Sequence, residues 1–271
     1  MTVAEVDEIL RWAKPTRINV LGGEPTEHKN FEQILRRIVP SVSSTNLITN
    51  LLFSPSIAQA IDLIPKSKLT ILANAGDLDV DDRLITFSRN WNHLCGFERT
   101  ASLTLDHSRT ADYYVKYVDA LTSTMQIKTI RLSMMYPGAT QDKAPYFINN
   151  HALGDFYWTI VERIVSKKIQ TGFDCYIYPC IFKDPKKYAR YANIFRLCNG
   201  AKDFMNNDEV LFCWPCESIR VKWRDYASYD AMNEAINKKY FEFKNRNLPA
   251  ECRACDHAGK DCFGPCGAFK Q

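Results

Sequence analysis

A regular alternation of strand-like and helical segments runs through the first two thirds of this 271-residue chain and constrains its fold most. Short runs of β-branched and apolar residues recur between segments whose apolar residues have helical spacing. The strand-like runs are 17–21, 45–52, 69–73, 101–105 and 129–135, and the helical segments are 3–13, 28–39, 56–63, 83–93, 110–122 and 147–166. This α/β pattern predicts parallel βα units, in a barrel or an open doubly wound sheet.

Glycine-rich and polar segments follow several of the strand-like runs. In both architectures the carboxyl ends of parallel strands meet at one edge, and ligands bind there. We therefore expect the strand-end residues to line one mouth: Gly22, Gly23, Glu24, Pro25, Asn50, Asn74 and Asp106.

The pattern changes after about residue 170, where turns rich in proline and glycine become frequent and cysteines accumulate. Residues 173–178 and 209–212 are predicted as strands, and residues 229–246 as a helix. We therefore predict two domains, a βα domain over residues 1–170 and a smaller, cysteine-rich domain over residues 171–271.

The tail contains four cysteines within fifteen residues, Cys252, Cys255, Cys262 and Cys266, with glycines and a proline between them. Thiolates this close repel one another unless a metal or disulfides hold them. A chain of this length with 46% hydrophobic residues can bury a sizeable core and needs no disulfides to fold. Iron–sulfur clusters and structural zinc both accept four cysteines. The tail is therefore predicted to be a metal site.

The remaining composition bears on location and partners. The first residues lack the basic and apolar regions of a signal peptide, and no stretch is apolar enough for a membrane span, so we expect a cytoplasmic protein without a membrane partner. The net charge of +4 favours an anionic partner only weakly. The basic and aromatic runs 183–191 and 238–246 are typical of solvated helix faces, and nucleic acid is not expected as a partner.

A strand–Gly-Gly-Glu-Pro–helix arrangement in a βα repeat, together with a cysteine-rich tail, resembles the radical S-adenosylmethionine (SAM) enzymes. Within them it is most similar to the branch with the SPASM cluster-binding extension. The resemblance implies a TIM-like (β/α) barrel in which residues 22–25 bind the amino group of SAM, through backbone carbonyls and the added charge of the Glu24 carboxylate. It also implies that the strand ending at Asp106 lines the same mouth.

The SPASM pattern begins with C-x(9–15)-G-x4-C. Here Cys198 is followed by nine residues, Asp208, four residues and Cys213. Asp208 replaces the family's glycine, and Asn206-Asn207-Asp208 can supply the same turn because Asn and Asp tolerate the left-handed region.

The pattern continues with C-x2-C-x5-C-x3-C and a final cysteine. The four tail cysteines match it with one extra residue in the middle gap, and the final cysteine is missing, although Cys216 could replace it. The resemblance implies one or two auxiliary [4Fe–4S] clusters, with zinc as an alternative. One cluster would use Cys198, Cys213 and Cys266, and the other Cys252, Cys255 and Cys262. Each lacks a fourth ligand, for which the candidates are Cys175, Cys180 and Cys216.

One family feature is absent from the sequence. Radical SAM enzymes hold the cluster that cleaves SAM with C-x3-C-x2-C after the first strand, and this motif occurs nowhere here. We expect the barrel to lack its first strand, so that the chain as written does not cleave SAM. An upstream segment or a partner chain would then complete an enzyme that modifies a peptide, protein or small molecule. Alternatively, the chain is a degenerate, non-catalytic binding or scaffold protein with a structural metal. Self-association at the open barrel edge is a further expectation.

Overall fold

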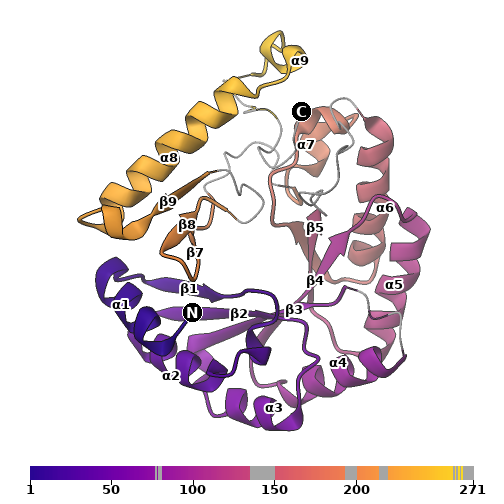
Figure 1. Ribbon diagram of the computed structural model, residues 1–271. Coiled ribbons are helices and arrows are strands. Elements are labelled where there is room, and N and C mark those ends of the chain that lie inside the picture. Colours follow the sequence, from indigo (N-terminus) through magenta and orange to yellow (C-terminus); the bar gives the residue numbers. More distant parts are fainter. Residues whose placement is uncertain are drawn as a thin grey trace. The chain divides into compact units, whose positions relative to one another are not determined.

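The computed structural model describes residues 1–76, 78, 81–134, 150–192, 200–213, 219–258, 260, 262 and 264. The chain divides into two compact units (Figure 1). Unit 1 comprises Met1–Ser133 and Glu162–Thr171, and unit 2 comprises Met134–Val161 and Gly172–Gln271.

A six-stranded sheet carries the βα repeat. Its strands are β1 (Arg17–Val20), β2 (Ser44–Thr49), β3 (Leu69–Asn74), β4 (Glu98–Leu105), β5 (Thr129–Met134) and β6 (Gln170–Phe173). The strands are ordered in the sheet as they are in the chain, and β1 to β4 pair in parallel. The α/β prediction is therefore confirmed. A doubly wound sheet reverses its strand order part-way, so the unbroken order favours the barrel-type repeat, and closure of a barrel stays a prediction.

Helices connect the strands of unit 1. They are α1 (Val3–Ala13), α2 (Phe31–Ser41), α3 (Pro55–Asp62), α4 (Asp81–His93), α5 (Ala111–Thr124) and α6 (His151–Ser166), which is divided between the units. Helices α2 to α5 lie on one face of the sheet (Figure 1). Thr2 and Glu5 form the capping box that starts α1, as its sequence predicts. No helix in the described ranges is both long and apolar enough to cross a lipid bilayer.

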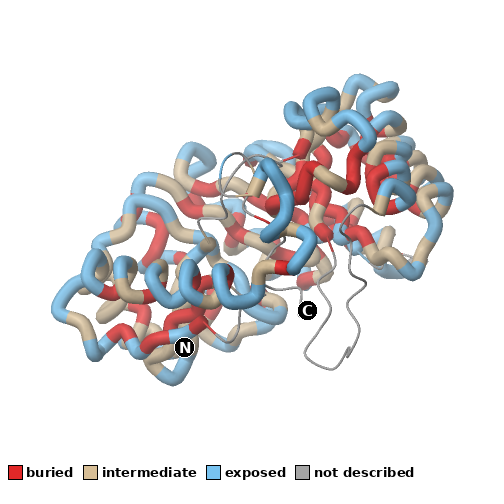
Figure 2. The backbone as a smooth tube through the Cα atoms, turned by 90° about the horizontal axis from the view of Figure 1, so that it is seen from above, coloured by how far each residue is buried: buried red, intermediate tan, exposed pale blue. Residues whose placement is uncertain are grey.

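The core of unit 1 lies between the sheet and these helices. Along β2, residues alternate strictly between half-buried and buried, and Leu47 is fully buried. Ile71 on β3 and Leu103 on β4 are also almost completely buried, and so is Phe87 on α4. The helices turn exposed residues outward and buried ones inward (Figure 2). This one-sided burial is what the periodic apolar patterns predict.

Unit 2 contains a small antiparallel sheet of β7 (Asp203–Phe204), β8 (Glu209–Leu211) and β9 (Arg220–Lys222). The helix predicted over residues 229–246 is α8 (Tyr229–Arg246), and Tyr240 on α8 stacks on Phe212 with ring centroids 4.0 Å apart. Short helical segments complete the unit: η3 (Pro179–Ile181), α7 (Pro185–Tyr188), η5 (Trp223–Asp225) and α9 (Ala250–Arg253).

The strand predicted over residues 173–178 is wrong. The strand in this region is β6, which ends at Phe173, and residues 174–178 continue without regular structure into η3. Tyr176, Ile177 and Tyr178 are all buried. They do not alternate between two faces as strand residues would, because an irregular segment can bury consecutive side chains.

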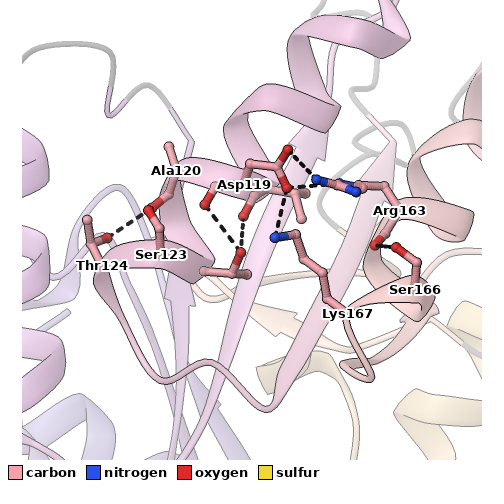
Figure 3. A network of polar contacts seen from close by, with 9 residues as sticks. Asp119, Ala120, Ser123, Thr124, Arg163, Ser166 and Lys167 are labelled. Carbon is pink, nitrogen blue, oxygen red and sulfur yellow. Dashed lines mark hydrogen bonds and ion pairs between the residues drawn. The ribbon is translucent and has the colours of Figure 1, made fainter.

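Asp119 on α5 ties that helix to the last turn of α6 within unit 1 (Figure 3). Its carboxylate accepts two hydrogen bonds from Arg163, at 2.9 and 2.7 Å, and lies 2.9 Å from the Lys167 ammonium. The hydrogen bond from Arg163, followed by that from Lys167, lowers the pKa of Asp119 to about 2. Because the Asp119 side chain is 36% exposed, solvent screens much of this interaction.

We expect Asp119→Asn to lower the free energy of unfolding at pH 7 by about 1 kcal/mol or less, the range for exposed ion pairs. A lowered carboxyl pKa stabilises the fold above the unfolded pKa, and this stabilisation is lost as the pH falls toward the folded pKa. The difference between wild type and variant should therefore shrink as the pH falls from about 4 toward about 2. Urea unfolding across this range checks the prediction, and a difference independent of pH contradicts it.

Candidate functional site

The Glu24 carboxylate joins the ends of β1 and β2. Its Oε1 atom accepts hydrogen bonds from the Thr26 amide at 3.1 Å, the Thr26 hydroxyl at 2.6 Å and the Thr49 hydroxyl at 2.8 Å. Its Oε2 atom accepts from the Asn50 amide at 2.7 Å. Both oxygens are therefore engaged in holding the two strand ends together.

The two glycines before Glu24 are open to solvent. Gly22 and Gly23 are exposed, and an added Cβ at either position would meet no atom within 4 Å. Pro25 is buried at the start of η1 (Pro25–Glu27), where its missing N–H costs no helical hydrogen bond. This turn thus combines a fixed end at Glu24 with an accessible backbone at the glycines, so a ligand can approach the peptide groups closely.

A buried asparagine holds the turn after β2, and the sequence analysis did not find it. Asn90 on α4 is 1% exposed, and its Nδ2 donates to the carbonyls of Leu51 at 2.7 Å and Phe53 at 2.9 Å. Leu51 has a φ of 56°, in the left-handed region. The Asn50 side chain accepts from the Leu52 amide at 2.8 Å. Asn50 therefore shapes this turn with both its backbone and its side chain.

Two tyrosines of α5 hold the next two strand ends. The Tyr114 hydroxyl accepts from the Asp106 amide at 2.6 Å and donates to the Thr104 carbonyl at 3.3 Å. One turn further along, the Tyr117 hydroxyl donates to the Ala75 carbonyl and accepts from the Leu78 amide at 3.3 Å. These side chains fasten the segments after β4 and β3 to the same helix.

The Asp106 carboxylate is partly used by its own turn. Its Oδ1 accepts from the Ser108 amide at 2.9 Å, and this backbone hydrogen bond is the main cause that lowers the pKa of Asp106. The Ser108 side chain also hydrogen-bonds this carboxylate, and Asp106 is half-buried and stays ionised at neutral pH.

The predicted mouth residues all follow adjacent strands of one parallel sheet. Residues 22–25 follow β1, Asn50 follows β2, Asn74 ends β3 and is exposed, and Asp106 follows β4. Because β1 to β4 are parallel neighbours, these residues lie at the same end of the sheet, where the carboxyl ends of the strands meet. The edge offers exposed peptide groups and carboxylate oxygens, a combination suited to a ligand that carries an ammonium group.

We expect Glu24→Gln to lower the free energy of unfolding by about 1–3 kcal/mol. Glutamine keeps one carbonyl oxygen but turns an NH₂ group toward donors that need an acceptor. The matched control is Glu27→Gln, an exposed position in the same short helix. Urea unfolding of both variants tests this, and equal stabilities for the two would contradict the role given to the Glu24 carboxylate.

The cysteine site lies in unit 2, and the structure describes part of it. Cys213, Cys252, Cys255 and Cys262 are described, whereas Cys198, Cys216 and Cys266 fall outside the described residues. Cys252 lies on α9, and the segment after it folds back on itself. Its backbone bonds join the Cys255 amide to the Cys252 carbonyl at 3.2 Å, and the Cys262 amide to the His257 carbonyl at 3.0 Å.

The thiols of this segment are electrostatic neighbours. Burial, followed by the proximity of Cys180, Cys262 and Cys255, raises the pKa of the Cys252 thiol to about 11. Gathered and partly desolvated thiols of this kind favour the neutral form unless a cation compensates their charge. Cys180 belongs to η3, so the structure brings one of the three candidate fourth ligands beside the tail cysteines.

The turn that carries Cys180 packs on α6 at a glycine. A Cβ added to Gly154 would lie 2.2 Å from the Ile181 carbonyl oxygen, a distance that no side chain tolerates. The ring of His151, one turn earlier on α6, lies with Nδ1 3.2 Å from the same oxygen. Gly154 is therefore a second residue that sequence reasoning missed, because only the close approach of η3 requires it.

The donor set fits an iron–sulfur cluster by residue type. Among the residues that the structure describes, no three histidine, cysteine or acidic side chains already converge closely enough to hold a metal ion. Cys252, Cys255, Cys262 and Cys180 are thus neighbours that do not yet point at one centre. Four thiols from one tight segment and one adjacent turn match the ligand requirement of a [4Fe–4S] cluster.

The turn before Cys213 confirms the expectation for Asp208. Its φ is 62°, the left-handed conformation for which the SPASM pattern uses glycine. The Asp208 carbonyl accepts from the Trp223 amide at 3.0 Å, and its carboxylate lies 2.8 Å from Arg224 Nε. Asp208 therefore makes the turn and also anchors it to η5.

No family model and no curated protein matches the sequence. The crystal structure of Streptococcus suis SuiB bound to S-adenosylmethionine matches 100% of this chain and 69% of its own chain, with a TM-score of 0.69 and 15% identity. The fold of this chain is similar to that of SuiB.

Two further SuiB crystal structures match less of the chain. SuiB alone and SuiB bound to the precursor peptide SuiA each match 79% of this chain, with TM-scores of 0.56 and identities of 14% and 15%. They are matched over 54% and 53% of their own length, so this chain spans about half of those structures. The likeness to SuiB concerns the fold, and the ligands named belong to SuiB.

Proposed function

We propose that this chain is an iron–sulfur protein of the radical SAM type, which binds SAM at the edge of β1 to β4 and acts on a peptide or protein. The observation that carries the proposal is the Gly22–Pro25 turn at the end of β1, in a fold shared with a SAM-bound protein. SuiB also has a structure with a precursor peptide, which supports a peptide as the substrate class.

The proposed SAM site uses the backbone more than side chains. The exposed carbonyls at Gly22 and Gly23 accept from the ammonium of the SAM methionine. The Glu24 carboxylate is used in hydrogen bonds to the strand ends, so the role of Glu24 is to fix the position and direction of these carbonyls. Asn50 and Asp106 line the same edge, and Asp106 contributes negative charge toward the cationic ligand.

The proposed auxiliary cluster lies in unit 2. Cys252, Cys255 and Cys262 supply three thiolates, and Cys180 replaces the missing final cysteine of the SPASM pattern as the fourth ligand. Cys198, Cys213, Cys216 and Cys266 are the candidate ligands of a second cluster. Such clusters relay electrons or bind substrate in this family, and the role of this chain's own residues is to hold the sulfur atoms.

The cluster that cleaves SAM needs thiolates that this sequence does not contain. No C-x3-C-x2-C motif is present, and the proposal assigns that cluster to a further polypeptide segment or a partner chain. A second candidate function is a non-catalytic protein that uses the same strand ends and the cysteine unit for binding. Self-association or a partner at the open barrel edge belongs to the same proposal.

Iron analysis tests the cluster. We expect protein purified without oxygen to contain iron and sulfide with the broad absorbance of a [4Fe–4S] cluster, and Cys252→Ala and Cys180→Ala each to lose about four iron atoms per chain. Cys95→Ala, at an exposed cysteine of unit 1, is the matched control and should keep its iron. Zinc instead of iron in the wild-type protein, or thiols paired as disulfides, would refute the proposal.

Measurement of SAM binding tests the proposed site at the strand ends separately from the cluster. Gly22→Val adds a side chain that meets no protein atom, so the variant should fold normally while blocking the approach of the ligand. We expect SAM to raise the melting temperature of the wild type, and binding by the variant to be at least about tenfold weaker. Gln59→Val adds the same side chain at an exposed site on α3 and should bind as the wild type does. Equal binding by all three proteins would exclude this site.

A further inference from the structure

A buried lysine of unit 2 lies beside Tyr176, a tyrosine that contacts the cysteine segment. Lys244, in the last turns of α8, is only 7% exposed, although lysine is among the residues least often buried. Its ammonium is 3.5 Å from the Tyr240 hydroxyl. It also lies 5.4 Å from the ring centroid of Tyr176 and 5.8 Å from that of Tyr240. Two tyrosine side chains therefore lie next to this buried side chain.

Tyr176 connects this charge to the cysteines. Its side chain is buried, with 5% exposure, and its hydroxyl lies 3.2 Å from the Cys262 sulfur. One ring thus has the Lys244 ammonium within cation–π distance and a cysteine sulfur at its hydroxyl. All three residues belong to unit 2, although 68 and 86 positions separate Tyr176 from Lys244 and Cys262 in the sequence.

The direction of the hydrogen bond follows from the state of the sulfur. A thiolate has no proton to donate, so a Cys262 that ligates a metal must accept from the Tyr176 hydroxyl. A hydrogen bond to a charged acceptor is stronger than one between neutral groups. The ammonium lies at the Tyr176 ring, and a cation there draws electron density from the phenol, which makes its hydroxyl a stronger donor to the sulfur.

We propose that Tyr176 and Lys244 are positioning residues that hold Cys262 as a thiolate ligand and favour the reduced state of its iron–sulfur cluster. This inference rests on the proposed function, because it needs a cluster on Cys262. Reduction adds negative charge to a cluster and its sulfur ligands. A hydrogen bond to one ligand, strengthened by the cation at the ring of its donor, therefore stabilises the reduced form more than the oxidised form and raises the reduction potential.

The test is a redox titration of the purified, cluster-containing full chain, followed by electron paramagnetic resonance. Tyr176→Phe removes only the hydroxyl, and we expect the ratio of reduced to oxidised cluster at a fixed potential to fall about two- to tenfold, the worth of one hydrogen bond. Lys244→Met keeps the length and burial of the side chain without its charge, and should shift the ratio in the same direction. Lys244→Arg, which restores the charge, should recover part of the shift.

Matched controls separate this effect from general damage. Tyr188→Phe removes a hydroxyl from a half-buried tyrosine of α7, and Lys238→Met removes a charge from an exposed position of α8. Both should titrate as the wild type does. Iron content and melting temperature are measured on every variant, so that a shifted potential is read only from proteins that carry a full cluster.

The outcomes are distinct. Full iron with unchanged potentials in Tyr176→Phe and Lys244→Met overturns the inference and leaves the proposed function intact. A wild-type protein without an iron–sulfur cluster refutes the proposed function, and the inference falls with it. If Tyr176→Phe loses its cluster, Lys244→Met decides: a lowered ratio supports the inference, and an unchanged ratio overturns it.

Discussion

The hydrogen bonds of the Glu24 carboxylate are the constraint on which the candidate SAM edge depends. A parallel sheet leaves peptide groups unpaired where its strands end, and these groups must be satisfied before the edge can present any of them to a ligand. Glu24 does this for β1 and β2, Asn90 for the turn after β2, and Tyr117 and Tyr114 for the segments after β3 and β4. The backbone at Gly22 and Gly23 stays accessible because these side chains hold the segments around it in place.

Unit 2 meets a different constraint, the repulsion and desolvation of gathered thiols. Burial and neighbouring sulfur atoms disfavour the Cys252 thiolate, as its raised pKa reports. The metal ions of a cluster would remove this penalty because their positive charge compensates the thiolates, and the Lys244 ammonium lies 5.4 Å from the centroid of the Tyr176 ring, whose hydroxyl contacts Cys262. The two features have the same physical origin, since negative charge held away from water needs compensation nearby.

Much of the fold could be predicted from the sequence, because local patterns determine it. The helix over residues 229–246, the α1 capping box and the left-handed Asp208 each follow from residues within a few positions of one another. The strand over residues 173–178 was wrong because an irregular buried segment also carries apolar residues. The clamps by Asn90, Tyr114 and Tyr117 were missed because each acts on backbone groups, and most of these lie far away in sequence. For the same reason, spacing alone could not show that Cys180 lies near Cys252, which is 72 positions away.

A physical argument explains how the fold can resemble that of SuiB at only 15% sequence identity. Burial patterns and backbone hydrogen bonds can be satisfied by many side chains, so a βα fold survives extensive substitution. A turn that presents peptide carbonyls tolerates substitution for the same reason, because every residue has a carbonyl. A low overall identity is therefore compatible with the same βα architecture, which is what the comparison with SuiB shows.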